Sequence, residues 1–187
     1  LVRSRGLGDV YKRQPLAFLF FLTPPPLEIV TIAAATVSSL SAEVSYNIFK
    51  AVGVPITLTT DYGAPALIVT DPSGASIPFV IGAASSGIYS LIGFSIFAAF
   101  LTYIARGPAR KKAIIFLAGL PLIYALNIIR IIILVSIGMW LGAETAFETF
   151  HILGGWTLIF LGTLLLLAFS GKIFRIQILT PKTSLQH

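Results

Sequence analysis

The sequence predicts an all-α polytopic membrane protein, a helix bundle that carries a small extracytoplasmic β-hairpin. Hydrophobic residues make up 56% of the 187 positions and charged residues only 11%. The mean hydropathy of +0.93 is too high for a soluble domain of this size. Three stretches, at about 86–105, 113–141 and 152–171, approach or exceed the roughly 20 apolar residues that a membrane-crossing helix needs. One membrane-embedded unit is therefore predicted.

Basic residues at the ends of these stretches predict the orientation. The net charge is +6, and the positive residues fill the loop between the first two spans and follow the third: Arg106, Arg110, Lys111, Lys112, Lys172, Arg175 and Lys182. The positive-inside rule puts both clusters in the cytoplasm of a multi-pass plasma-membrane protein, with the 142–151 connection outside. The basic residues are not interleaved with aromatic residues on a helix face, so no nucleic-acid partner is expected.

The two ends of the chain differ from this unit. Residues 1–14 lack the continuous apolar core and cleavage site of a signal peptide and resemble translated adapter sequence, so we expect a non-native segment. Residues 15–23 are predicted to be a truncated transmembrane helix, ended by three prolines. The membrane domain is expected over 24–171 and a cytoplasmic tail over 172–187.

Two elements precede the first full span. Apolar residues recur every three or four positions over 27–52, which predicts an amphipathic helix on or between the spans, with a fourth crossing as the alternative. Three short β-branched runs follow within 56–81, and Asp71-Pro72-Ser73-Gly74 has the composition of a type I turn. An outer β-hairpin is predicted there, leading directly into Ser85.

The composition excludes several kinds of site. There is no cysteine, so a thiol nucleophile, a thiolate metal site and a disulfide are all excluded. The two histidines, one of them the terminal His187, are too few for a metal cluster. We expect no metal and no cofactor.

Small polar residues stand where the first span is predicted to begin. Ser85 and Ser86 there have two interpretations. The hydroxyls could cap the helix by accepting from its free backbone N–H groups. Alternatively, Ser85 could be a nucleophile, with the same N–H groups and the positive helix end stabilising an oxyanion.

Arg130 interrupts the long apolar run of the second span, where a cation is costly and usually marks function or a buried partner. Asn127, three residues earlier, lies on the same helix face. At about 1.5 Å per residue from Ala113, Arg130 lies about 25 Å along the helix, near the outer leaflet and level with Ser85. The alternative is that Arg130 extends to the lipid headgroups.

His151 is predicted at the head of the third span, also on the outer side. As an alternative, it is an interface residue beside Trp156. Ser85, Arg130 and His151 would arrive from three helices at one depth, which suggests a nucleophile, a cation and a base.

These motifs resemble those of the exosortase/archaeosortase family of membrane transpeptidases over about 24–156. Ala84-Ser85-Ser86-Gly87-Ile88-Tyr89-Ser90-Leu91 is similar to the family's Ala-Cys-Ser-Gly-Ile-x-Ser-Leu. Asn127-x-x-Arg130 and His151-x-x-x-Gly155 follow in the family's order.

The resemblance implies an enzyme that sorts secreted or surface proteins. It would cleave their C-terminal signal, made of a motif, a transmembrane helix and a basic tail, through an acyl-enzyme. The substrate would then pass to an acceptor, with a membrane lipid among the candidates. By matched positions Ser85 is the nucleophile, Arg130 the electrostatic partner and His151 the proton-transfer residue, supported by Ser86, Gly87 and Asn127.

One position departs from the family, since Ser85 stands where the family has cysteine. A thiol beside a cation ionises readily, whereas a hydroxyl needs a general base within hydrogen-bond reach. The serine is similar to that of an archaeal, thaumarchaeosortase-like branch. A catalytically inactive relative, or a Cys→Ser substitution, would have the same sequence.

Two other classes remain open. A rhomboid-like intramembrane serine protease also pairs serine with histidine, but it needs Gly-x-Ser-Gly, and Ala84 stands at the first of these positions. A non-enzymatic membrane protein could hold a substrate helix and pair its carboxylates with Arg130. A transporter is less favoured, because the polar groups gather at one face and do not line a path across the membrane.

Overall fold

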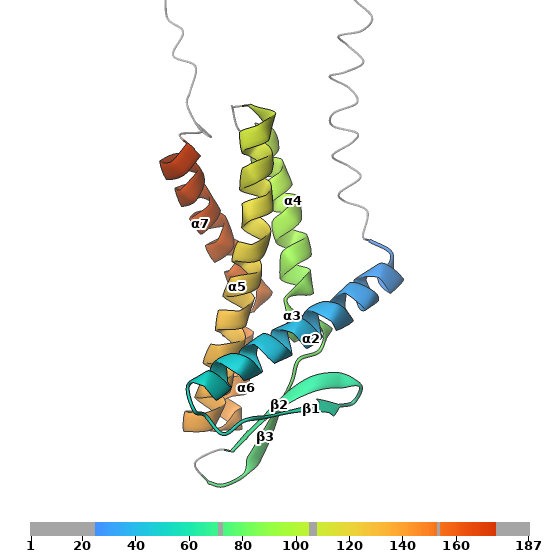
Figure 1. The fold of residues 1–187 in the computed structure, drawn as a ribbon, viewed down its shortest axis with the longest axis vertical. Coiled ribbons are helices and arrows are strands. Elements are labelled where there is room, and N and C mark those ends of the chain that lie inside the picture. Colours follow the sequence, from blue (N-terminus) through green and yellow to red (C-terminus); the bar gives the residue numbers. More distant parts are fainter. Residues whose placement is uncertain (1–24, 71–72, 105–107, 153, 175–187) are drawn as a thin grey trace, which may run out of the picture.

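The computed structural model describes residues 25–70, 73–104, 108–152 and 154–174. The chain is mainly helical, as predicted, with one small sheet (Figure 1). Its elements are, in order, α2 (Leu27–Ala51), β1 (Thr57–Asp61), β2 (Ala64–Thr70), β3 (Ser76–Val80), α3 (Ala83–Ser86), α4 (Ile88–Ile104), α5 (Ala109–Leu141), α6 (Ala143–Ile152) and α7 (Gly155–Phe174). The segments predicted at 1–14 and 15–23, and the tail from 175 onward, lie outside the described residues.

Three of the helices, α4, α5 and α7, pack as a bundle (Figure 1). Their shared core contains Phe94 of α4, Ile123 of α5 and Leu166 of α7. With 33 residues, α5 is about 50 Å long, well beyond the roughly 30 Å of a bilayer's hydrocarbon core. Its last turns therefore extend past the bundle, where they meet α2, α6 and the sheet.

Two of the described helices, α2 and α5, are each long and apolar enough to cross a membrane. The pair α6 and α7, bent by 53°, adds a third crossing if it forms one broken span. The span predicted at 86–105 is represented by α4, which has only 17 residues, because Gly87 at φ 90° separates it from α3. The span predicted at 152–171 begins later, with α7 at Gly155.

The helix predicted over 27–52 is α2, which crosses α5 obliquely in Figure 1. Its buried face is made mainly of small residues, which allow close approach: Ala34, Ser38, Ser41, Ala42 and Ser45, with Val30 and Phe49 near the ends. This face packs on α3 and β2. The helix is thus packed against the site segment, and its composition also fits the fourth crossing that the sequence left open.

The sheet has three strands, one at each of the three β-branched runs within 56–81, and therefore one strand more than the predicted hairpin. The strands are antiparallel in the order β1-β2-β3. Tyr62 at φ 47° and Gly63 at φ 76° join β1 to β2, and two successive positive φ values define a type I′ hairpin turn. The sequence interpretation missed this turn because a tyrosine is uncommon at positive φ.

Two apolar cores meet at one polar layer on α5. The bundle core includes Phe94 and Ile123. A second core, which joins α2, the sheet and the later half of α5, includes Ile131. Between Ile123 and Ile131, α5 carries Asn127 and Arg130, both buried. The predicted site therefore lies where the bundle meets the sheet and α2.

Candidate functional site

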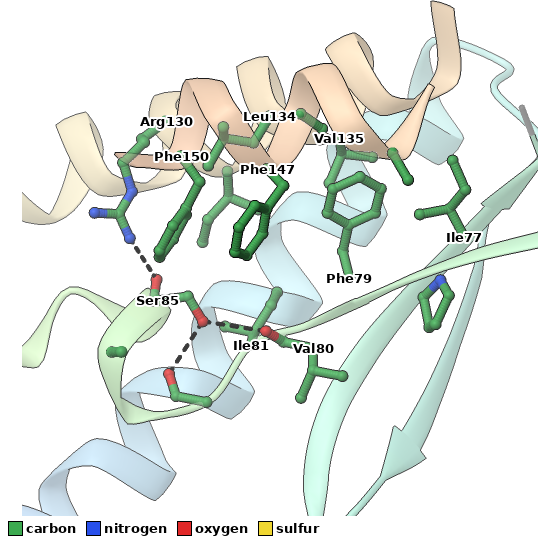
Figure 2. Close-up of a pocket in the computed structure, with 16 residues that line it drawn as sticks. Ile77, Phe79, Val80, Ile81, Ser85, Arg130, Leu134, Val135, Phe147 and Phe150 are labelled. Atoms are coloured by element: carbon green, nitrogen blue, oxygen red, sulfur yellow. Dashed lines mark hydrogen bonds between the residues drawn. The ribbon is translucent and has the colours of Figure 1, made fainter. Parts of the chain in front are cut away.

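Ser85 lies in α3, a four-residue helix, and not at the start of α4 as the sequence predicted. Its backbone N–H and that of Ser86 both donate to the Gly82 carbonyl, at 3.1 and 2.8 Å. These two N–H groups are therefore engaged and are not available to the oxyanion that the sequence interpretation placed beside Ser85. The Ser85 hydroxyl lies 3.2 Å from both the Val80 and the Gly82 carbonyl oxygens, and its one O–H is shared between these two acceptors (Figure 2).

The capping role falls on the neighbouring serine. Ser86 is fully buried, and its hydroxyl accepts from the backbone N–H of Ile88 at 3.2 Å while donating to the Ala83 carbonyl at 2.9 Å. It thus satisfies one of the N–H groups that a helix start leaves unpaired. Of the two interpretations that the sequence left open, capping describes Ser86.

Two side chains of α5 bind the backbone carbonyls at the C-terminal end of α3. The Asn127 amide donates to the Ser86 carbonyl at 2.7 Å, and Arg130 Nη2 donates to the Ser85 carbonyl at 3.1 Å. The three-residue spacing places both donors on one helix face, so they bind successive carbonyls. Ser41 of α2 also lies 3.5 Å from the Ser86 carbonyl. The Asn-x-x-Arg motif therefore fixes the segment that carries Ser85.

Gly87 makes this arrangement possible. It has a φ of 90°, which favours glycine, and a Cβ there would lie only 2.6 Å from Asn127 Cγ. Only glycine both allows the left-handed turn after α3 and leaves room for the amide.

Arg130 is held inside the protein, with 4% of its surface exposed. Its guanidinium lies 5.4 Å from the centre of the Phe150 ring, within the range of a cation–π interaction. Its Nε is buried without a hydrogen-bond partner among the described residues. The interpretation that Arg130 extends to lipid headgroups therefore does not fit this structure.

An apolar pocket of about 550 Å³ opens beside Ser85 and Arg130 (Figure 2). Residues 77–82 form one wall and α5 and α6 form the other, with Leu134, Phe147 and Phe150 among their contributions. Ser85 and Arg130 supply the only polar side chains among its lining residues. The pocket thus offers a hydroxyl and a cation at one end of an apolar chamber.

His151 does not join these two residues. It lies in α6 and not at the head of α7, its side chain is exposed, and it makes no hydrogen bond to Ser85 or Arg130 within the described ranges. Its ring packs edge-on against Phe147 at 4.7 Å and contacts Phe150 at 6.0 Å, measured between ring centroids. The structure therefore brings together two of the three predicted residues and leaves His151 behind two pocket-lining rings.

Some site residues were missed by the sequence interpretation. Ser41 contacts the Ser86 carbonyl from 45 positions away, and only its place on the small-residue face of α2 could have indicated it. Phe147 and Phe150 were not singled out because aromatic residues near a membrane boundary are common. In the described part of the chain, no group of three metal-ligating residues occurs.

The sequence matches one protein-family model over most of its length. The model described as Transmembrane exosortase (Exosortase_EpsH) matches residues 11–168. The chain belongs to the transmembrane exosortase family. Exosortases are membrane cysteine peptidases and transpeptidases that act on substrates with C-terminal sorting signals. This exosortase therefore belongs to a class of membrane sorting enzymes. Comparisons with curated proteins and with solved structures gave no match.

Proposed function

We propose that this exosortase is a serine-dependent sorting peptidase and transpeptidase whose nucleophile is Ser85. One observation carries the proposal: Ser85 and Arg130 meet at the polar end of an otherwise apolar pocket. A guanidinium has five N–H donors. In Arg130, one of the two N–H groups on Nη2 donates to the Ser85 carbonyl. Arg130 lines the pocket beside Ser85, and its remaining N–H donors suit an oxyanion formed there.

The proposed reaction has two steps. The Ser85 hydroxyl oxygen attacks the carbonyl carbon of the scissile peptide bond, His151 takes the hydroxyl proton, the C–N bond breaks, and the amine leaves with that proton. An amine or hydroxyl acceptor, a membrane lipid among them, then attacks the acyl ester. Its proton returns through His151 to the Ser85 oxygen.

This role requires His151 to move. Its ring contacts Phe147 and Phe150, which line the pocket, so rotation of the side chain or a shift of α6 on substrate binding would bring it toward Ser85. Catalytic hydrogen bonds often tighten only once substrate is bound.

The proposed substrates are secreted or surface proteins with a C-terminal sorting signal. Arg110 and Lys111 are exposed at the first turn of α5, about 30 Å along the helix from Arg130. The positive-inside rule then favours an extracytoplasmic site in a multi-pass plasma-membrane protein. The serine agrees with the thaumarchaeosortase-like branch that the sequence resembles.

A specific observation also favours a second function, in which the protein is catalytically inactive and only holds a substrate helix. The single O–H of Ser85 is shared between two backbone carbonyls, and neither is a base. In that case Arg130 would serve binding alone.

Covalent labelling with a serine-directed fluorophosphonate decides between them. The protein in membranes is compared with Ser85→Ala, His151→Ala and, as a control, Ser39→Ala on the exposed face of α2. We expect labelling to vanish in the first two variants and persist in the third. Absence of labelling in the folded native chain would favour the inactive relative, and Ser85→Cys would then test whether a thiol restores peptidase activity.

A further inference from the structure

We propose that the free edge of β3 binds an extended polypeptide segment parallel to it and guides that segment to Ser85. The inference rests on the proposed function in one respect, namely that the segment is the part of the substrate on the N-terminal side of the cleaved bond. The pairing itself needs no reactive hydroxyl.

Hydrogen bonds fix which groups of β3 face outward. β3 is an edge strand of the sheet, and the N–H of Ile81 donates to the Pro65 carbonyl of β2 at 2.8 Å. Because bonded and non-bonded pairs alternate in an antiparallel ladder, Phe79 also faces β2, whereas Pro78 and Val80 present their backbone groups to the free edge. Pro78 fits this assignment, since proline is tolerated where its missing N–H points away from the sheet.

The groups left on this edge match one direction of pairing. The Ser85 hydroxyl already donates to the Val80 carbonyl, which leaves the Val80 N–H and the Pro78 carbonyl without partners among the described residues. In a parallel segment, the carbonyl of a single residue can accept from the Val80 N–H, and the N–H of the same residue can donate to the Pro78 carbonyl. An antiparallel segment would have to share the Val80 carbonyl with the Ser85 hydroxyl. Because β3 runs toward Ser85, a parallel segment would run toward it too.

The pocket lies along this edge. Six consecutive residues, 77–82, line it. Side chains alternate between the two faces of a strand, so a cavity on one face would be lined by every second residue. Because consecutive residues line this pocket, it reaches the edge of the strand. At its end stand the side chains of Ser85 and Arg130.

These features favour a polypeptide over a lipid tail. An acyl chain would fill the apolar part of the pocket between Phe79 and Phe150, but it would leave the Val80 N–H and the Pro78 carbonyl unsatisfied in an apolar setting, which is costly. An extended peptide satisfies the two edge groups and places apolar side chains in the same space. Strand addition of this kind is a recurrent mode of peptide recognition.

Disulfide trapping tests the pairing, helped by the absence of native cysteine. Val80→Cys is introduced into the otherwise native full chain in detergent micelles. The probes are capped heptapeptides of alternating valine and threonine in which one cysteine is moved along five positions. Parallel pairing predicts trapping at alternate positions about fivefold above the intervening ones, since neighbouring side chains leave the strand on opposite faces.

The other edge of the sheet supplies the matched control. Thr60 is exposed on β1, the opposite edge strand, and does not line the pocket, so Thr60→Cys should trap every peptide weakly and without alternation. Trapping of Val80→Cys without alternation, or no trapping at all, would overturn the inference. So would trapping that phospholipid nanodiscs abolish, which would assign the pocket to an acyl chain.

The two proposals fail separately. Alternating trapping together with absent fluorophosphonate labelling would keep the edge as a peptide site and remove Ser85 as a nucleophile. Labelling without alternation would keep the nucleophile and remove the pairing.

Discussion

Arg130 on α5 donates a hydrogen bond to the backbone carbonyl of Ser85 at 3.1 Å, across 45 positions of the chain. With Asn127 on the next carbonyl, it ties the segment that carries Ser85 to the longest helix. The buried cation thus has a structural task as well as the proposed electrostatic one, and substitutions at Arg130 must be interpreted with both in mind.

Arg130→Lys is expected to slow fluorophosphonate labelling of Ser85 by about 10²-fold. A lysine ammonium is a point charge without the planar fork of donors, so it cannot hold the Ser85 carbonyl and face the pocket as well. The labelling rate is measured beside Arg110→Lys, an exposed position at the start of α5. Equal rates in the two variants would remove Arg130 from the chemistry.

Gly87→Ala is expected to destabilise the protein by more than the 1–2 kcal/mol or so of left-handed strain alone, because the new Cβ would meet Asn127 at 2.6 Å. Gly63→Ala supplies the control. Gly63 has a φ of 76°, and an added Cβ there would meet nothing within 4 Å. Gly63→Ala therefore measures the cost of left-handed backbone strain without crowding. Thermal unfolding in detergent that ranks the two variants equally would contradict the proposed crowding at Asn127.

Phe150→Leu is expected to lower stability by about 2 kcal/mol beyond the lost packing, because the buried Arg130 loses its contact with the aromatic face. Phe150→Tyr keeps that face and should retain most of the stability. Thermal unfolding in detergent distinguishes them. If the tyrosine variant is as unstable as the leucine variant, packing and not the cation–π contact accounts for the loss.

Ser86→Ala and Ser85→Ala are expected to differ in stability. The first removes the hydroxyl that caps Ile88 and should cost about 0.5–2 kcal/mol. The second should stay within about 0.5 kcal/mol, since the Gly82 carbonyl keeps both of its backbone donors. Chemical denaturation measures both. A cost for Ser85→Ala as large as that for Ser86→Ala would make the Ser85 hydroxyl structural.

Part of the site could be predicted from the sequence because it depends on local spacing. Asn127 and Arg130 are three residues apart on one helix, so their shared face follows from helix geometry alone, and a buried cation in an apolar run indicates a partner whatever the fold. The role of His151 depends on where α6 ends and α7 begins. The sequence interpretation treated 142–151 as a connection and began the third span at 152, so it placed His151 at the head of that span and not in the last turn of α6.

By itself, the sequence determined the membrane class, the helical content and the identity of the polar groups, because hydropathy and helical periodicity depend on neighbouring residues. The tertiary structure decided which carbonyls Asn127 and Arg130 bind, that Ser86 and not Ser85 caps α4, and that β3 borders the pocket beside Ser85. Contacts between positions more than 40 residues apart depend on how α2, α3 and α5 pack around Gly87, and no local pattern encodes that packing.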